Sequence, residues 1–153
     1  MRVLGVRCSN KDYSYAVLEG GRSAPVLVAS ASHLYPKGYS TPETLKWLLQ
    51  EMESLNNQHS VTHWAIKGAE PMAAKGQIYA SRVECEAMVS LSAANRGSSN
   101  VVRKVKPTIA KDLGLPGKAS SLTDKLDKSL LPGLFSMPDK EFEAVVVAWS
   151  ELV

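Results

Sequence analysis

The stretch VTHWAIKGAEPMAAKGQIYASRVECEAMVSLSAA, residues 61–94, predicts a strand, a loop and a long helix in succession. Residues 61–66 form a short run with β-branched and aromatic members, which favours a buried strand, and Lys67 and Gly68 allow the backbone to turn. A loop of mostly small residues follows at 69–76. In open α/β sheets ligands bind beyond the carboxyl ends of the strands, so we expect the functional region between Lys67 and Gly76.

The helix predicted over residues 77–94 should be amphipathic. Its apolar residues recur at three- to four-residue spacing and are expected to face a core; they are Ile78, Val83, Ala87, Met88, Leu91 and Ala94. Arg82, Glu84 and Glu86 are expected to lie largely off this face. A further strand is predicted over 101–105, and a strand-helix-strand unit implies a right-handed crossover to a parallel neighbour.

Three strands are predicted before this unit. Residues 3–6 form an apolar run, residues 13–19 alternate in polarity, and residues 25–31 contain the apolar triplet 26–28. The turns between them are short, so consecutive strands should be antiparallel neighbours. A helix should then start at residues 41–44, with Thr41 as its cap, Pro42 at its first position and Glu43 as an early acid, and it should end at Asn56 and Asn57.

Three more helices are predicted after the fifth strand, over residues 107–113, 122–131 and 139–152. The second carries Leu122, Leu126 and Leu130 at four-residue spacing, and the third should be capped by Asp139. The whole pattern predicts an α/β fold with a five-stranded mixed sheet of order 3-2-1-4-5. Strand 4 should run parallel to strand 1, and helices should cover both faces.

Composition limits the possible classes of protein. A chain of 153 residues with 44% hydrophobic content suits one compact domain, over residues 1–153. The net charge is only +3, but residues 67–118 hold nine Lys/Arg against four acids, and residues 119–153 hold three against six. Cys8 and Cys85 have no metal-ligand spacing, which favours reduced thiols in the cytoplasm. We expect no signal peptide, membrane span or cofactor.

The element order and several short motifs resemble the ribonuclease H-like superfamily, and within it the RuvC-type Holliday-junction resolvases. Residues 3–6 resemble that family's first strand, and Ala65-Ile66-Lys67 its fourth-strand segment. Similar matches follow at 105–109, at 117–120 (Gly-Lys-Ala-Ser) and at 143–148 on the last predicted helix. The chain is also similar to small uncharacterised bacterial domains of that superfamily. The resemblance covers nearly the whole chain and implies the fold described above.

This chain departs from the resemblance at the metal-binding positions. Such nucleases hold two divalent metals with acids at the ends of the first and fourth strands and on the last helix. Here Arg7 and Lys67 stand at the two strand positions, while Asp139 and Glu143 keep acids one helical turn apart. Cations at these positions should repel a metal, so we expect no Mg²⁺ or Mn²⁺ site and no catalytic residues. Glu70 is expected to be a solvated loop acid.

Other chemistries find little support in the sequence. His33, His59 and His63 are not spaced as metal ligands or as partners of a catalytic cysteine. The Gly-Lys-Ala-Ser segment lacks the glycine of a P-loop, so Lys118 would at most contact a single phosphate. Five tyrosines offer rings for base stacking; they are Tyr13, Tyr15, Tyr35, Tyr39 and Tyr79. Tyr79 is the best placed of them, and Tyr13 and Tyr15 are expected to pack in the fold.

Two classes of function remain open. In the first, the domain is an interaction or structural subunit in which Arg7 and Lys67 pair with Glu143 and Asp139, and the surface recruits a protein partner or a second copy. In the second, it is a non-catalytic module that binds DNA or RNA through a basic cleft. The residues for that contact would be Arg7, Lys67, Lys75, Tyr79, Arg103, Lys104 and Lys118. We favour the first, and a divergent nuclease is a remote alternative.

Overall fold

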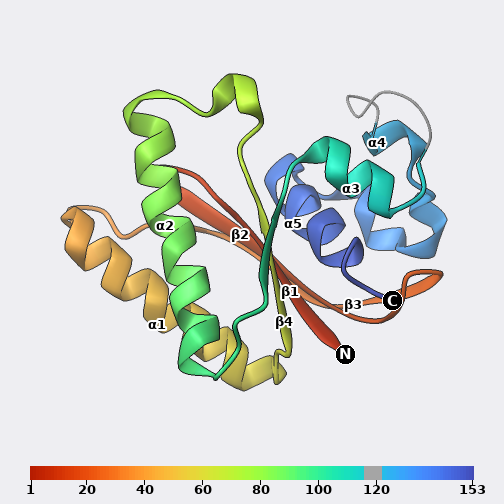
Figure 1. Cartoon of the computed structure of the whole chain (residues 1–153), viewed down its shortest axis with the longest axis horizontal. Coiled ribbons are helices and arrows are strands. Elements are labelled where there is room, and N and C mark those ends of the chain that lie inside the picture. The colour runs from red at the N-terminus through yellow and green to blue at the C-terminus, as the bar shows by residue number, and fades with distance from the viewer. Residues whose placement is uncertain (116–121) are drawn as a thin grey trace.

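A computed structural model describes residues 1–115 and 122–153 (Figure 1). The strands are β1 Arg2–Cys8, β2 Asp12–Gly21, β3 Ala24–Leu34, β4 His63–Lys67 and β5 Val101–Lys104. The helices are α1 Thr41–His59, α2 Gly76–Asn95, α3 Lys106–Asp112, α4 Leu122–Lys125 and α5 Asp139–Trp149. Short 3-10 turns lie at Pro71–Ala73, Lys128–Leu130 and Pro132–Ser136.

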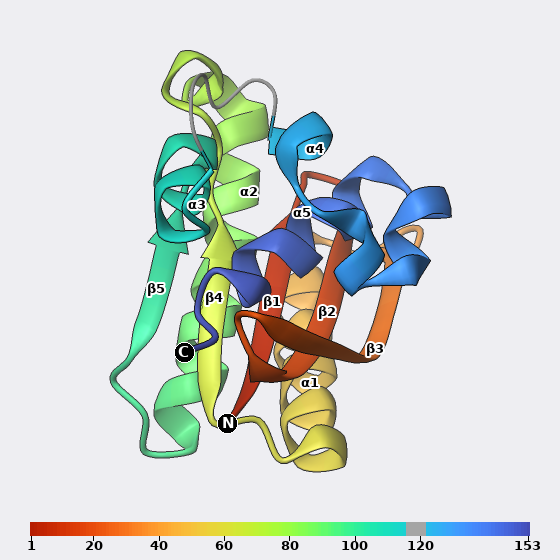
Figure 2. The same cartoon turned by 90° about the vertical axis from the view of Figure 1, so that its right-hand side faces the viewer.

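The strands form one mixed sheet in the order β3-β2-β1-β4-β5, with β3 and β5 at its two edges (Figure 2). β1, β2 and β3 pair antiparallel, whereas β4 is parallel to both β1 and β5. Val3 pairs with His63 and Val6 with Ile66, so the fourth strand lies directly beside the first. The predicted strand order and directions are confirmed.

Helices cover both faces of the sheet: α1 and α2 pack on one face, and α5 packs on the other (Figure 1). Side chains alternate along β1, so adjacent residues enter different cores. Leu4 packs on the α1 and α2 side with Leu48, Met52 and Val89. Val3 packs on the α5 side with Val145 and Ala148. The apolar run of the first strand is therefore buried on both of its faces.

Gly5 sets how closely α5 approaches the sheet. A Cβ atom at position 5 would lie 2.1 Å from the Ala144 carbonyl oxygen and 2.8 Å from the Ala148 Cβ. No larger residue fits between β1 and α5 without moving the helix. Because α5 lies on β1 at this distance, its first turns reach the carboxyl end of β1, where the candidate site lies.

The N-cap of the long helix α1 lies one residue before the predicted cap, Thr41. Ser40 is its N-cap, and its hydroxyl and Glu43 form a reciprocal capping box, with Pro42 in the first turn. The helix also continues past Asn56 and Asn57 to His59, where Ser60 adopts a left-handed conformation with φ of 49°. Asn56 is buried, and its side-chain oxygen accepts a hydrogen bond from the Trp64 indole at 2.9 Å. This bond ties α1 to β4.

The predicted buried face of α2 is wrong. Ile78, Ala87, Leu91 and Ala94 are exposed, and Val83 and Met88 are half-buried. Glu86 is fully buried rather than solvated. The buried positions are instead Cys85, Glu86, Val89, Ser92 and Ala93. Hydropathy favours apolar residues as core positions, but small and polar side chains fill the close contact between α2 and the sheet. The Glu86 carboxylate enters this contact together with two arginines.

The C-terminal half departs from the predicted helices at two points. The helix expected over 122–131 ends at Lys125, and Asp127 then caps a 3-10 turn by accepting the Ser129 N–H at 3.0 Å. Asp139 does not cap α5, because the N-cap is Pro138 and Asp139 lies in the first turn. None of the helices in the described part of the chain is long and apolar enough to cross a membrane.

Candidate functional site

The central contact of the candidate site joins β1 to α5. The Arg7 Nε atom lies 2.9 Å from Glu143 Oε2, and the two side chains are 17% and 20% exposed. Arg7 also donates through a terminal nitrogen to the Cys8 carbonyl oxygen at 3.2 Å. The expected pairing of Arg7 with the acid of the last helix is therefore present.

Lys67, at the end of β4, has a different partner from the expected one. Its side chain is 2% exposed, and its Nζ atom donates to the Gly68 carbonyl at 2.7 Å and to Glu70 Oε1 at 2.8 Å. Glu70 also accepts the Lys106 backbone N–H at 3.1 Å. Lys67 thus pairs with Glu70 rather than with Asp139 or Glu143, and Glu70 is an ion-pair partner rather than a solvated acid. The prediction failed because the loop after β4 turns back over the strand end.

A pocket of about 180 Å³ lies between these two ion pairs. It is lined by Lys67, Lys106, Asp139 and Glu143 together with apolar residues of α4 and α5. The Lys106 Nζ atom lies 3.7 Å from Glu143 Oε1, and Asp139 is exposed at the start of α5. Arg7, Lys67 and Lys106 bring three cations to this region, and Glu70, Asp139 and Glu143 bring three acids, so the formal charges balance.

A second charged cluster, on the α2 face, was missed from the sequence. Glu86 is 1% exposed and bonds Arg82 Nε at 2.8 Å and Arg103 Nη2 at 2.6 Å. Arg82 also donates to the Lys67 carbonyl oxygen, and the Arg103 side chain passes closely over Gly68. This cluster connects α2 to the ends of β4 and β5. The four-residue spacing of Arg82 and Glu86 was the available signal, because such pairs share one face of a helix.

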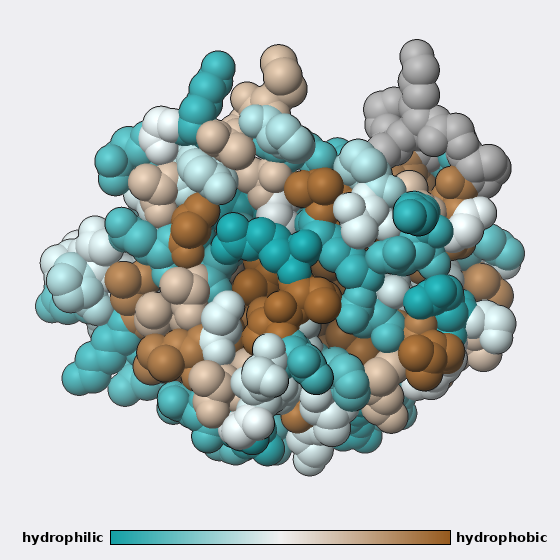
Figure 3. All heavy atoms as spheres, viewed as in Figure 1, coloured by the Kyte–Doolittle hydropathy of each residue, from teal (hydrophilic) through white to brown (hydrophobic). Residues whose placement is uncertain are grey.

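The residues considered for nucleic-acid contact differ in their environments. Arg103 is bonded to Glu86, and Lys104 is bonded to Asp112 at 2.6 Å and also to Glu151. Lys75 is exposed at the N-cap of α2, and Tyr79 is half-buried in the first turns of that helix. Lys118, with the segment 117–120, lies outside the described residues. On the face shown in Figure 3, hydrophilic residues surround a group of hydrophobic residues near the centre.

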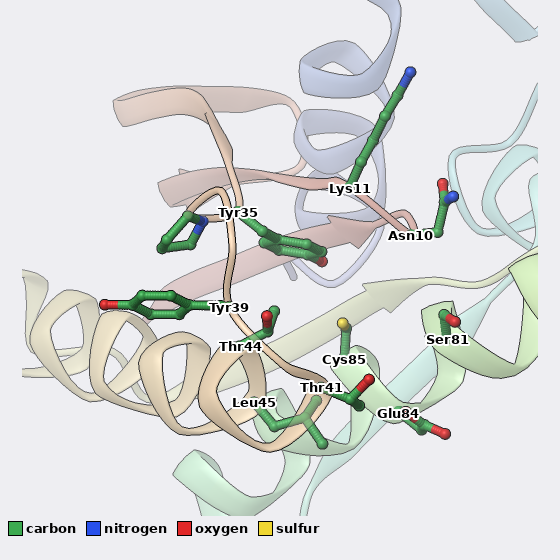
Figure 4. A pocket seen from close by; sticks show the side chains of 11 residues that line it. Asn10, Lys11, Tyr35, Tyr39, Thr41, Thr44, Leu45, Ser81, Glu84 and Cys85 are labelled. Atoms are coloured by element: carbon green, nitrogen blue, oxygen red, sulfur yellow. The ribbon is translucent and has the colours of Figure 1, made fainter.

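A larger cavity of about 310 Å³ lies on the α1 and α2 side of the sheet (Figure 4). Tyr35, Tyr39 and Cys85 are among its lining residues, and the Tyr35 hydroxyl donates to the Ser9 carbonyl at 3.1 Å. Burial raises the pKa of the Cys8 and Cys85 thiols, so both stay protonated near neutral pH. Tyr13 packs against Tyr15 and Trp47 as expected.

The side chains at the candidate site do not fit a two-metal centre. Mg²⁺ and Mn²⁺ require several oxygen ligands, usually carboxylates. Glu143, which bonds Arg7 at the end of β1, also lies beside Lys106. Within residues 1–115 and 122–153, no group of three or more His, Cys, Asp or Glu residues is placed to share a metal ion. The donor set matches ion pairing rather than metal coordination.

Comparison with known proteins identifies the fold. No family model matches the sequence, and no curated protein matches it. The structure is similar to Thermus thermophilus RuvC, with a TM-score of 0.79, 13% identity and coverage of 98% of this chain and 92% of that chain. It is also similar to T. thermophilus RuvC in complex with a Holliday junction substrate, with a TM-score of 0.77, 12% identity and coverage of 98% of this chain and 91% of that chain. A third similar structure is the yeast mitochondrial Holliday junction resolvase Ydc2, with a TM-score of 0.66, 13% identity and coverage of 97% of this chain and 76% of that chain. At these identities the likeness is one of fold: the chain has a RuvC-like, ribonuclease H-like fold.

Proposed function

We propose that this RuvC-like domain is catalytically inactive as a nuclease and acts as an interaction or structural subunit. The observation that carries the proposal is the 2.9 Å bond between Arg7 and Glu143. In the RuvC-type resolvases that the sequence resembles, these two positions correspond to metal-binding carboxylates. Here one of them is a guanidinium that neutralises the other, so the contact that ties α5 to β1 is an ion pair.

Entry of a divalent metal would require this arrangement to be taken apart. Glu143 would have to release Arg7, and the ion would then lie close to the guanidinium and to the Lys106 ammonium. Unit charges about 4 Å apart interact by roughly 4 kcal/mol at the effective dielectric constant of a protein surface. The ion would be repelled by both Arg7 and Lys106, and few carboxylates are available to offset this repulsion, so metal binding is unfavourable.

The alternative function is a non-catalytic nucleic-acid-binding module. Exposed Lys75 and half-buried Tyr79 support it, since a cation and an aromatic ring lie together at the start of α2, after the β4 loop. We rank it second because Arg7, Lys67, Arg103 and Lys104 all have internal acidic partners. Each would have to give up an intramolecular bond to contact a phosphate.

Retention of nucleic acid at several salt concentrations separates the two functions. The protein is incubated with a labelled four-way DNA junction and with single-stranded RNA, with and without Mg²⁺ or Mn²⁺. We expect no cleavage and no steep loss of retention with salt. A slope of several units in log K against log salt would favour the nucleic-acid module, because each phosphate contact contributes about 0.9 for duplex DNA and about 0.7 for single strands. Metal-dependent cleavage would overturn the proposal.

A charge reversal at position 7 tests the ion-pair argument directly. In Arg7→Asp a carboxylate faces Glu143 and Asp139, so added Mn²⁺ should raise the melting temperature of this variant. Arg7→Ala is the matched control, because it removes the cation without adding a ligand. Neither the natural chain nor Arg7→Ala should respond. A Mn²⁺-dependent shift in the natural chain would show that Arg7 does not exclude the metal.

A further inference from the structure

A cavity of about 310 Å³ lies on the α1 and α2 side of the sheet, away from the candidate site (Figure 4). Its lining comes from the β1–β2 turn, the loop between β3 and α1, the first turns of α1 and the middle of α2. Small-molecule sites in proteins occupy about 300–1,000 Å³. This cavity lies at the lower end of that range, so it suits a ligand with one or two rings.

Bonds within the protein hold the walls of this cavity in place. The Tyr35 N–H donates to the Lys11 carbonyl at 2.9 Å, and the Tyr35 hydroxyl donates to the Ser9 carbonyl at 3.1 Å. The Tyr35 ring also packs edge-on against the Trp47 ring, with centroids 6.2 Å apart. The capping box at the start of α1 fixes the first turn of that helix. A cavity with fixed walls loses little conformational freedom when it binds a ligand, which favours affinity.

The cavity combines an aromatic ring with free hydrogen-bonding groups. Tyr35 lies across it from Thr44 and Cys85 (Figure 4). Among the residues that the structure describes, the Asn10 and Thr44 side chains have no hydrogen-bond partner in the protein. Flat heteroaromatic ligands stack on aromatic rings, and an asparagine amide both donates and accepts, as the edge of a nucleobase requires. The lining groups therefore match a nucleobase.

The charges around the cavity argue against a phosphorylated ligand. Lys11 is the single cation among the described lining residues, and Glu84 balances it. In Figure 4 the Lys11 ammonium and the Glu84 carboxylate lie at the outer edge of the group of side chains, so neutral groups surround its centre. Phosphates and nucleic-acid backbones are held by clusters of cations, and the described lining residues form no such cluster. An uncharged ligand is therefore the better match.

We propose that this cavity is a binding site for a free, uncharged nucleobase or nucleoside. The ring of the ligand stacks on Tyr35, and its edge bonds the side chains of Asn10 and Thr44. The ligand contacts the β1–β2 turn, the β3–α1 loop and α1 at once, so its binding stabilises the fold. The cavity shares no residue with the candidate site, and the inference goes beyond the proposed function.

Titration of the full chain with neutral nucleosides tests the site. Adenosine, cytidine and uridine are titrated by calorimetry, and adenosine monophosphate and ribose serve as the charged comparison and the comparison without a base. We expect adenosine to bind with a dissociation constant below about 1 mM and to raise the melting temperature. Adenosine monophosphate and ribose should bind at least about tenfold more weakly, because the cavity lacks cations for a phosphate and ribose lacks an aromatic ring to stack.

Two pairs of variants locate the bound nucleoside. Thr44→Phe fills the cavity with a ring and should abolish adenosine binding, whereas Ser90→Phe places the same ring at an exposed position of α2 outside the cavity and should preserve it. Asn10→Leu has nearly the same shape without the amide and should weaken adenosine binding about fivefold or more. Asn100→Leu makes the same change at an exposed position outside the cavity and is its control. Melting temperatures show that each variant is folded.

Several results would overturn the nucleoside site. They are no binding of any of the three nucleosides, equal binding of adenosine monophosphate, equal binding of ribose, and adenosine binding that Thr44→Phe leaves unchanged. A single-stranded oligonucleotide that binds more tightly than adenosine and loses this affinity in Thr44→Phe would also overturn it, because the ligand would then be a polymer. None of these experiments involves the metal or the Arg7–Glu143 pair, so failure of the nucleoside site is distinct from failure of the proposed function.

Discussion

At the end of the sheet where β1 and β4 terminate, one charged cluster lies on the α2 face and another on the α5 face, and they differ in burial. Glu86 of the α2 cluster is 1% exposed and bonds two arginines. Arg7 and Glu143 of the α5 cluster are 17% and 20% exposed and bond each other. Water can replace a lost partner only where it can enter. The α2 cluster therefore supports the fold, whereas the α5 cluster is where charges can be exchanged while the fold persists.

Removing the Glu86 carboxylate should have the largest effect. Glu86→Ala leaves the largely buried Arg82 guanidinium without its carboxylate and removes the partner of Arg103. We expect the free energy of unfolding to fall by about 3–5 kcal/mol in urea melts. Glu84→Ala, an exposed position on the same helix, is the control and should change it by less than about 0.5 kcal/mol. Equal losses in the two variants would contradict the structural role of Glu86.

The Arg7–Glu143 pair should have an intermediate effect, because water reaches part of it. Arg7→Ala and Glu143→Ala should each lower the free energy of unfolding by about 1.5–3 kcal/mol, the range for hydrogen bonds to charged groups. The double variant should lose less than the sum of the two, with a coupling energy of at least about 0.5 kcal/mol. Urea unfolding of the four proteins measures it. Strict additivity would exclude direct pairing and leave Arg7 available for a phosphate.

The Lys67–Glu70 pair should appear in the acid dependence of stability. Partial burial raises the pKa of Glu70, but hydrogen bonds from the Lys67 side chain and the Lys106 backbone outweigh it, so the pKa lies below its usual 4.5. A carboxyl with a lowered folded-state pKa stabilises the fold above its unfolded-state pKa, and this stabilisation is lost as the pH falls through the folded-state value. Between about pH 6 and pH 3, the natural chain should therefore lose more stability than Glu70→Gln. Parallel curves would contradict the pairing.

The smallest effect is expected at Arg2 and Glu19, which bond at 2.7 Å but are each 39% exposed. Their coupling energy in the cycle of Arg2→Ala and Glu19→Ala should be about 0–1 kcal/mol and should fall with added salt. This pair extends the comparison to a third level of exposure. A coupling as large as that of Arg7 and Glu143 would show that exposure does not control the strength of these pairs.

The sequence determined the order and type of most elements, because those depend on local patterns. The apolar run at 3–6, the alternation at 13–19 and the short turns predicted an antiparallel β1-β2-β3 unit, and the run at 61–66 predicted β4 beside β1. Errors arose at element ends and faces. The cap of α1 is Ser40 rather than Thr41, and the helix predicted over 122–131 is interrupted after Lys125.

The tertiary structure decided which charges meet. The resemblance placed Arg7 and Glu143 near each other although 136 positions separate them, but the partners of Lys67 and Glu86 could not be inferred in this way. Hydropathy assigns a charged residue to the surface one position at a time. Glu86 is buried because α2 and β5 bring two arginines to it, and Lys67 is buried because the following loop brings Glu70 back over the strand. A buried charge is stable only with its counter-charges, and only the folded chain brings these together.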